Sequence, residues 1–344
     1  MANDIVTQAI ERVASGSDLS SEEAARVLRE VMEGRVGETQ TAGFLIALRT
    51  KGETVDEVAG LAKTMRELAL RVDVGADNLV DTAGTGGGSP SFNVSTTAAL
   101  LAAAAGATVA KHGNRSATGR CGSADVLEAL GARIDLEPGA IAECIADVGF
   151  GFMFAPLHHT AMRHVVPVRR ELGVRTIFNL LGPLTNPAGA RRQLIGVSDP
   201  SYLETMAGAL SRLGSESALI VSAEDGLDEL SVSAPTRVVE LRNGEIDSYT
   251  ITPEEAGVEP MSGDALAQGD PDENAALTRA VLAGKANGVE RSLVVLNAGA
   301  ALYVAGVSGS IQAGVGDASD ALDSGAAADL LERYVARTQA LAPA

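Results

Sequence analysis

Residues 78–113 read NLVDTAGTGGGSPSFNVSTTAALLAAAAGATVAKHG, with an apolar run at each end and a glycine-rich loop and an alanine-rich run between them. A strand that leads through a loop and a helix to another strand is the unit from which parallel sheets are built. Similar apolar runs follow at GFGFMFA (149–155), RQLIGV (192–197), SALIVSAE (217–224) and SLVVLNAG (292–299), and we expect a strand at each. The sequence therefore predicts an α/β fold with a mainly parallel central sheet.

One pair of strands is expected to be antiparallel. The segment RVVELRNGEIDSYTI, residues 237–251, has Asn243-Gly244 near its centre. An Asn-Gly pair supplies the positive φ angles of a type I′ turn, which joins neighbouring antiparallel strands. The central sheet is therefore predicted to be mixed.

The chain before this α/β part has the pattern of a small helical domain. Its first seventy or so residues repeat apolar positions at helical spacing and contain no convincing strand. Ser20 with Glu23, and Thr54 with Glu57, have the S/T-x-x-E spacing of a capping box at a helix start. The segment 162–187, MRHVVPVRRELGVRTIFNLLGPLTNP, is also helical in pattern, and we expect it to return to the helical domain.

Composition limits the partners of the chain. Its 344 residues are 46% hydrophobic, which allows a full core. The formal net charge of −18 disfavours DNA or RNA, whose binding depends on Lys and Arg, and it means that any phosphate site is built locally from backbone N–H groups and a few cations. No apolar run approaches the roughly 20 residues that span a bilayer, and MANDIVTQAIERVA lacks the features of a secretory signal. We expect a cytoplasmic protein with no membrane or nucleic-acid partner, in which Cys121 and Cys144 are reduced packing residues.

The glycine-rich loop has the chemistry of a phosphate site. Glycines at 84 and 86–88 allow tight turns with N–H groups directed at one anion, and Asn93, Ser95 and Thr96 add polar groups at the following helix start. A dinucleotide fingerprint fits poorly because Ser89 stands where glycine is needed, and the G-K-[ST] of a P-loop is missing. A cluster of glycines that only makes turns is the alternative.

A second motif, KHGNRSATGRCGSADVLEALG, begins at Lys111 directly after an expected strand. Lys111 offers a point charge for phosphate, and Asn114 offers an amide. The run 115–123 is long enough to fold a loop around a diphosphate. Considered alone, His112 is more simply interpreted as a capping or loop histidine.

A pair of adjacent acids, Asp228 and Glu229, follows the expected strand 217–224. Two hard oxygen ligands on a loop suit a Mg²⁺ ion that is held chiefly by the phosphates of a substrate. Adjacent acids are more often solvated surface residues, and that interpretation is favoured when the pair is considered alone.

Taken together, the motifs GTGG, KHGN, PVRRELGVRTIFNLLGPLTNP, DGLDELS and LNAGAALYVAG resemble those of anthranilate phosphoribosyltransferases, over nearly the whole chain. The resemblance implies a small all-helical domain, residues 1–75 plus about 165–187, hinged to a larger α/β domain, residues 76–164 plus 188–344. It also implies a magnesium-dependent enzyme that transfers a phosphoribosyl group from phosphoribosyl diphosphate to anthranilate, in tryptophan biosynthesis. A homodimer that forms through the helical domains is expected.

The resemblance also implies the site residues by motif position. Phosphoribosyl diphosphate is expected at the glycine loop, the following helix start and the second motif: Gly84, Gly87, Gly88, Ser91, Asn93, Val94, Ser95, Thr96, Lys111, His112, Gly113, Asn114, Arg115, Ser116, Ala117, Thr118, Gly119 and Ser123. Mg²⁺ is expected on Ser95, Asp228 and Glu229. Anthranilate is expected at Asn114 and Arg169, with Gly84, His159, Gly182 and Pro183 nearby. Lys111, Asn114 and Arg169 are the predicted catalytic residues, and Arg169 also fits independently because a guanidinium pairs bidentately with a flat carboxylate.

Three positions depart from the family pattern. Gly88 replaces the usual acid of GTGGD, Thr160 replaces the proline of HHPAM, and residues 117–119 read Ala-Thr-Gly instead of a serine-rich run. Two other functions stay open. A pyrimidine nucleoside phosphorylase would use free phosphate as the nucleophile, and a catalytically weakened paralogue would bind a metabolite or nucleic acid without turnover.

Overall fold

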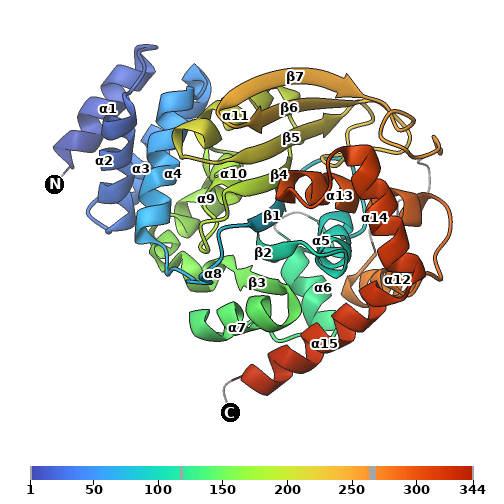
Figure 1. Ribbon diagram of the computed structural model, residues 1–344. Helices are drawn as coiled ribbons and strands as arrows, with labels where there is room; N and C mark the ends of the chain where they lie inside the picture. The colour runs from blue at the N-terminus through green and yellow to red at the C-terminus, as the bar shows by residue number, and fades with distance from the viewer. Residues whose placement is uncertain (1, 117–118, 263–268, 343–344) are drawn as a thin grey trace.

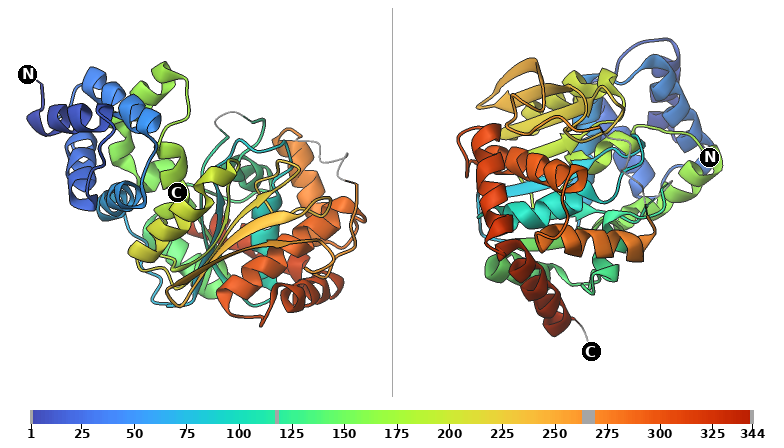
Figure 2. Two further views of the ribbon diagram at one scale, coloured as in Figure 1. Left: turned by 90° about the horizontal axis from the view of Figure 1, so that it is seen from above. Right: turned by 90° about the vertical axis from the view of Figure 1, so that its right-hand side faces the viewer.

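The computed structural model describes residues 2–116, 119–262 and 269–342. Helices from the start of the chain stand at one end of the molecule, beside a body that contains a twisted sheet (Figures 1 and 2). The last helices of the chain cover the part of the body farthest from these first helices (Figure 1). In the described ranges, no helix is both long and apolar enough to cross a membrane.

The N-terminal part consists of four helices, α1 (Asp4–Ala14), α2 (Ser21–Met32), α3 (Glu38–Lys51) and α4 (Val55–Leu68). Both predicted capping boxes are confirmed: Ser20 pairs reciprocally with Glu23 at the start of α2, and Thr54 with Glu57 at the start of α4. Each box satisfies backbone N–H groups that the first helical turn leaves unpaired.

The segment 162–187 is helical, as predicted. The chain forms α8 (Ala155–His158), then the 3₁₀ turn η1 (Thr160–His164), α9 (Val166–Leu172), α10 (Phe178–Leu181) and the 3₁₀ turn η2 (Gly182–Leu184). Val168 and Ile177 belong to the same hydrophobic core as Val27 and Leu61 of the N-terminal helices. That core continues onto one face of the sheet through Ile220, so the division at residues 75, 165 and 187 stays a prediction.

The strands of the described residues form one seven-stranded sheet in the order β3-β2-β1-β4-β5-β6-β7. They are β1 (Leu79–Gly84), β2 (Thr108–Gly113), β3 (Phe150–Phe154), β4 (Arg192–Gly196), β5 (Ser217–Ala223), β6 (Thr236–Arg242) and β7 (Glu245–Ile251). The first five are parallel, and β6 and β7 add antiparallel pairs. Asn243 and Gly244 have φ angles of 53° and 86°, so the predicted hairpin and the mixed sheet are confirmed.

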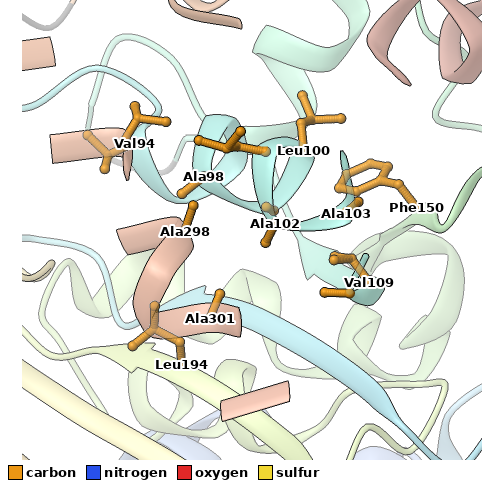
Figure 3. Close-up of a cluster of buried hydrophobic side chains, with 14 of the residues drawn as sticks. Val94, Ala98, Leu100, Ala102, Ala103, Val109, Phe150, Leu194, Ala298 and Ala301 are labelled. Atoms are coloured by element: carbon orange, nitrogen blue, oxygen red, sulfur yellow. The ribbon is translucent and has the colours of Figure 1, made fainter. Parts of the chain in front are cut away.

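Helices pack on both faces of the sheet. They are α5 (Val94–Ala104), α6 (Ser123–Ala129), α7 (Pro138–Val148), the 3₁₀ turn η3 (Pro200–Tyr202), α11 (Leu203–Arg212), α12 (Pro271–Leu282), α13 (Val289–Ala305), α14 (Ile311–Asp323) and α15 (Ala326–Leu341). Helix α5 is buried on nearly all sides, and Figure 3 shows Ala98 and Ala102 close to Ala298 of α13. Its small side chains allow the surrounding elements to approach closely, which fixes the helix that starts at the glycine-rich loop. Cys121 and Cys144 are free and buried, as expected.

The expected strand at 292–299 is wrong, because these residues lie inside α13. Residues 293–302 are all buried, so this helix has no polar face from which a helical period could be recognised. An apolar run that is buried on all sides cannot be assigned to helix or strand from periodicity alone.

Helices α13 and α14 are in contact through two glycines. A Cβ atom on Gly299 would lie 2.5 Å from the backbone nitrogen of Val315, and one on Gly314 would overlap the Gly299 carbonyl oxygen. Gly316, on the exposed side of α14, has open space around it. The two helices therefore need glycine where their backbones touch and not elsewhere.

We predict that Gly314→Ala lowers the free energy of unfolding by about 1 to 3 kcal/mol, because the helices must separate to admit a methyl group. Gly316→Ala is the matched control and is expected to raise it by about 0.5 to 1 kcal/mol, since alanine restricts the unfolded chain and favours the helix. Urea denaturation of the two variants measures the difference. Equal stability of the two variants would contradict the close contact.

Candidate functional site

A cleft of about 1320 Å³ opens at the carboxyl ends of the parallel strands. One wall is formed by the glycine-rich loop, the start of α5 and the loop after β2, and the other wall is formed by residues 155–183. Ligands of open α/β sheets bind at this edge. Every predicted site residue that the structure describes lines the cleft. Ala117 and Thr118 lie outside the described residues.

The glycine-rich loop is held from two sides. Gly86 and Gly87 have φ angles of 63° and 88°, a conformation that favours glycine. Arg175, which precedes α10, donates from Nη1 to the Gly86 carbonyl (2.7 Å) and from Nη2 to the Thr85 carbonyl (3.3 Å). Ser198, just after β4, donates its Oγ–H to the same Gly86 carbonyl (3.0 Å). The loop is therefore fixed before any ligand is bound.

Three glycines leave room for Asp228. A Cβ atom on Gly84 would lie 3.2 Å from Asp228 Oδ2, one on Gly88 would lie 2.9 Å from Oδ1, and one on Gly196 would overlap the Asp228 carbonyl oxygen. Gly88 does not have a positive φ angle, so a left-handed backbone conformation does not account for glycine at this position. Glycine at position 88 instead permits close approach of the loop that carries the acids.

Asp228 and Glu229 are not the solvated surface pair that the sequence alone favoured. Burial raises the pKa of both carboxyl groups, and the Asp228 charge raises the pKa of Glu229 further. Glu229 Oε2 is buried and has no hydrogen-bond partner among the described residues. Within the same ranges, no third His, Cys, Asp or Glu side chain completes a metal-binding cluster. Two converging oxygen ligands with a free acceptor suit Mg²⁺ whose other ligands come from a phosphate-bearing substrate.

Lys111 is buried at the base of the cleft, with 2% of its surface exposed. Its Nζ donates to the carbonyl oxygen of Thr82 and to Thr82 Oγ1 (3.0 Å), which leaves one of its three hydrogens for a ligand. Burial lowers the pKa of Lys111 to about 8. The neighbouring Asp81 accepts from the His112 N–H (3.0 Å) and from Asn186 Nδ2 (2.8 Å), and burial raises its pKa to about 6.

Two histidines lie together in the cleft. The rings of His112 and His159 have centroids 5.1 Å apart, and both side chains are buried. Burial lowers the pKa of His159 to about 4 and that of His112 well below its usual value, so both imidazoles are neutral at pH 7. Nε2 of His112 has no hydrogen-bond partner among the described residues. The pair presents neutral polar edges, not charges, to a ligand.

Some predicted ligands already have partners. Arg115 pairs with Asp125 and Glu128 at 2.8 and 2.5 Å, so its charge is largely neutralised. The side chain of Asn93 donates to the Cys121 carbonyl (3.2 Å) and accepts from Asn274 of α12 (2.9 Å). In this structure both residues shape the phosphate side of the cleft through these contacts.

The charge of the cleft is opposite to that of the whole chain. Its lining carries one lysine and five arginines but only two carboxylates: Lys111, Arg115, Arg163, Arg169, Arg170 and Arg175, with Asp228 and Glu229. The guanidinium of Arg169 lies over the Phe178 ring, 5.6 Å from its centroid, which holds it at the wall of the cleft. Local cations in a cleft concentrate anionic ligands, in spite of a net charge of −18.

Two parts of this chain match domains of one known protein family. The helical bundle domain of a glycosyl transferase family matches residues 7–69, and the a/b domain of the same family matches residues 76–328. The anthranilate phosphoribosyltransferase of Halorhodospira halophila is 52% identical over 340 residues, 98% of this chain and 99% of the relative. That of Rubrobacter xylanophilus is 51% identical over 339 residues, with 98% and 99% covered. The chain belongs to the anthranilate phosphoribosyltransferase family.

Solved structures of the family have the same fold. Anthranilate phosphoribosyltransferase (TrpD) from Thermus thermophilus superposes with a TM-score of 0.91 at 49% identity, over 96% of this chain and 99% of that chain. The Saccharomyces cerevisiae enzyme in complex with PRPP and Mg superposes with a TM-score of 0.88 at 27% identity, over 98% of each chain. The predicted arrangement of a small helical domain beside a larger α/β domain with a mixed, mainly parallel sheet is thereby confirmed.

Some residues of the site were missed in the sequence. Arg175 lies inside the quoted PVRRELGVRTIFNLLGPLTNP motif and Gly196 inside the expected strand 192–197, but their roles depend on contacts with residues that are distant in the chain. Asn186 lies inside the quoted FNLLGPLTNP motif, but its contact with Asp81 across 105 residues has no sequence signal. The structure places the predicted site residues that it describes in the cleft, whereas the role of each residue stays a prediction.

Proposed function

We propose that this chain transfers the 5-phosphoribosyl group from phosphoribosyl diphosphate to the amino group of anthranilate, giving N-(5-phosphoribosyl)anthranilate and diphosphate, as a step of tryptophan biosynthesis. The observation that carries the proposal is the contact between a phosphate-type glycine loop and a half-buried acid pair, with Arg169 in the facing wall. Membership of the family, at about 50% identity over the full chain, supports the same reaction.

The reaction exchanges one bond at C1 of the ribose. The bond from C1 to the diphosphate oxygen breaks with its electron pair on the diphosphate, the anthranilate nitrogen forms the new bond, and that nitrogen releases one proton. An aromatic amine is nucleophilic when neutral, so a strong general base is not needed. The contribution of the protein is then mainly electrostatic stabilisation and positioning.

Each wall of the cleft has a separate role in this proposal. Backbone N–H groups of Gly87, Gly88 and the start of α5 bind the diphosphate and phosphate, and Lys111 adds its remaining hydrogen. Arg169 and Asn114 hold the carboxylate side of anthranilate, with His159, Gly182 and Pro183 around the ring. Asp228, Glu229 and Ser95 hold Mg²⁺. When bound, Mg²⁺ neutralises charge on the leaving diphosphate.

The alternatives have less support. The relatives and solved structures named above are all anthranilate phosphoribosyltransferases, which disfavours a pyrimidine nucleoside phosphorylase. A non-catalytic paralogue has no need for a half-buried, desolvated acid pair beside the phosphate loop. A direct experiment is to mix the protein with phosphoribosyl diphosphate and Mg²⁺ and follow the loss of anthranilate fluorescence. No loss at any enzyme concentration would overturn the proposed function.

We also propose a cytoplasmic homodimer that forms through the helical domain. Helices α1 and α3 enclose a groove of about 720 Å³ lined by Ile10, Val13, Ala14, Gly16, Ala42, Gly43, Ile46, Ala47, Thr50 and Lys51. Ile5 and Ile46 beside it are 40% and 37% exposed. An apolar face on the N-terminal helices fits a second copy of the same face across a twofold axis.

Arg169→Ala is predicted to raise the KM for anthranilate about ten- to a hundredfold, with a much smaller effect on the KM for phosphoribosyl diphosphate. Removal of a charged hydrogen bond costs about 1.5 to 3 kcal/mol. Arg169→Lys keeps the charge but loses the paired N–H donors of the guanidinium, so we expect it to raise the KM for anthranilate by an intermediate amount. Steady-state kinetics with each substrate varied in turn measures the change in the KM for anthranilate and in the KM for phosphoribosyl diphosphate. Equal changes in both KM values would show that Arg169 is structural.

Gly88→Asp is predicted to shift the Mg²⁺ concentration at which turnover is maximal, because it adds a carboxylate beside Asp228. Gly88→Ala is the control, since it introduces the same close Cβ contact without the charge. Rates are measured against Mg²⁺ concentration and normalised for each protein. If the curves of the two variants have the same optimum, the metal explanation fails and only the steric effect is left.

Ile46→Glu is predicted to convert the dimer to a monomer, because a charge would be buried in the proposed interface. Val307→Glu is the matched control, as Val307 is 45% exposed on the C-terminal part of the chain. Light scattering coupled to size-exclusion chromatography gives the mass of each variant. A monomeric wild type, or an Ile46→Glu variant that stays dimeric, would contradict the proposal.

A further inference from the structure

The backbone directly after the acid pair is held by one side chain from α13. Oδ1 of Asn297 accepts a hydrogen bond from the Leu230 N–H (3.1 Å), and Nδ2 donates to the Leu230 carbonyl (3.0 Å). Nδ2 donates its other hydrogen to the Leu293 carbonyl one turn earlier in the helix (2.9 Å). The amide therefore pairs with residue 230 as the backbone of a neighbouring strand would, and both of its hydrogens are used.

Asn297 is a polar exception in its surroundings. It is 2% exposed, and the other buried residues of α13 are apolar. A buried amide destabilises a protein unless its hydrogen bonds are satisfied, so an asparagine in an apolar helix requires a specific partner. That partner is the backbone of the acid loop, residues 224–235, which connects β5 to β6 and carries Asp228 and Glu229. The motif LNAGAALYVAG contains this asparagine, and the proposed reaction assigns it no contact with either substrate.

The acid loop has different supports on its two sides. On its outer side, Asp225 accepts from Ser231 Oγ (2.5 Å) and Ser233 Oγ (2.6 Å), and the Gly226 carbonyl accepts from the Ser89 N–H (2.7 Å). Those contacts lie before and after the acids. Asn297 holds the peptide groups of the residue adjacent to Glu229, on the buried side that faces α13.

We propose that Asn297 is a positioning residue that sets the backbone of Asp228 and Glu229 for a divalent cation at the cleft. It acts through Leu230: Asn297 also lines the cleft, but both hydrogens of its side-chain amide are used within the protein, so it has no donor left for a substrate. Leu230 directly follows Glu229, so hydrogen bonds to its N–H and its carbonyl fix the backbone from which the two carboxylates project. The role in catalysis rests on the proposed function, whereas the effect on the loop does not.

Asn297→Ala removes the clamp, and Thr338→Val is the matched control. Thr338 is fully buried in α15, where Oγ1 accepts from the Arg133 N–H (3.1 Å) and donates to the Val335 carbonyl (2.8 Å). Both variants lose hydrogen bonds of a buried side chain, so both lower the melting temperature. In Asn297→Ala alone, we expect about tenfold faster hydrogen exchange in the segment 226–231 and an about tenfold higher half-saturating Mg²⁺ concentration for turnover. The KM for anthranilate should change by less than about threefold.

Two results would overturn the inference. One is that the segment 226–231 of the Asn297→Ala variant exchanges its amide hydrogens at the same rate as in the wild type. The other is that the half-saturating Mg²⁺ concentration of the variant is unchanged. Equal shifts in Thr338→Val would also overturn it, because they would show a general loss of stability. If Asn297→Ala does not fold, Asn297→Asp is measured instead, as it keeps the shape and the acceptor for Leu230 and loses both donors. Failure of the wild type to turn over would sink the proposed function alone, since the exchange measurement still decides whether Asn297 holds the loop.

Discussion

The close approach of two loops at Asp228 is the constraint on which the site depends. Gly84 at the end of β1, Gly88 in the glycine-rich loop and Gly196 at the end of β4 surround this aspartate, and a side chain at any of them would press on it. Gly86 and Gly87 allow the glycine-rich loop to turn, and Gly84, Gly88 and Gly196 leave room for Asp228. Because the two loops touch, the glycine-rich loop and the acid pair line one continuous part of the cleft.

The remainder of the fold keeps the glycine-rich loop and the acid loop in contact. The small residues of α5 let the sheet and the C-terminal helices pack closely around it, which fixes the helix start on the phosphate side (Figure 3). Helix α12 is also joined to the start of α5 by two side-chain hydrogen bonds. One joins Asn274 to Asn93, and the other joins Thr278 to Thr97 (3.0 Å). Arg175 connects the glycine-rich loop with the segment that packs on the N-terminal helices. Contacts between polar groups thus join elements that are far apart in the sequence.

Local chemistry explains which features were predictable. The capping boxes, the Asn243-Gly244 turn and the strand before the glycine-rich loop depend on neighbouring residues, and the structure has each of them. The run at 292–299 has no such signal, because a helix buried on all sides lacks a polar face. The burial of Asp228 and Glu229 could not be inferred from the pair itself. It results from glycines about 140 residues earlier in the chain and from a helix about 70 residues later.

The glycine-rich loop and the acid pair are proposed to form one site for a phosphate-bearing substrate and Mg²⁺. Calorimetric titration of phosphoribosyl diphosphate, with and without Mg²⁺, tests it on the wild type, on Asp228→Asn/Glu229→Gln and on Glu224→Gln, which changes an exposed acid of the same loop. Mg²⁺ is expected to tighten the binding of phosphoribosyl diphosphate at least about tenfold in the wild type and in Glu224→Gln but not in the double variant, which keeps its fold. Equal Mg²⁺ dependence in all three proteins would contradict it.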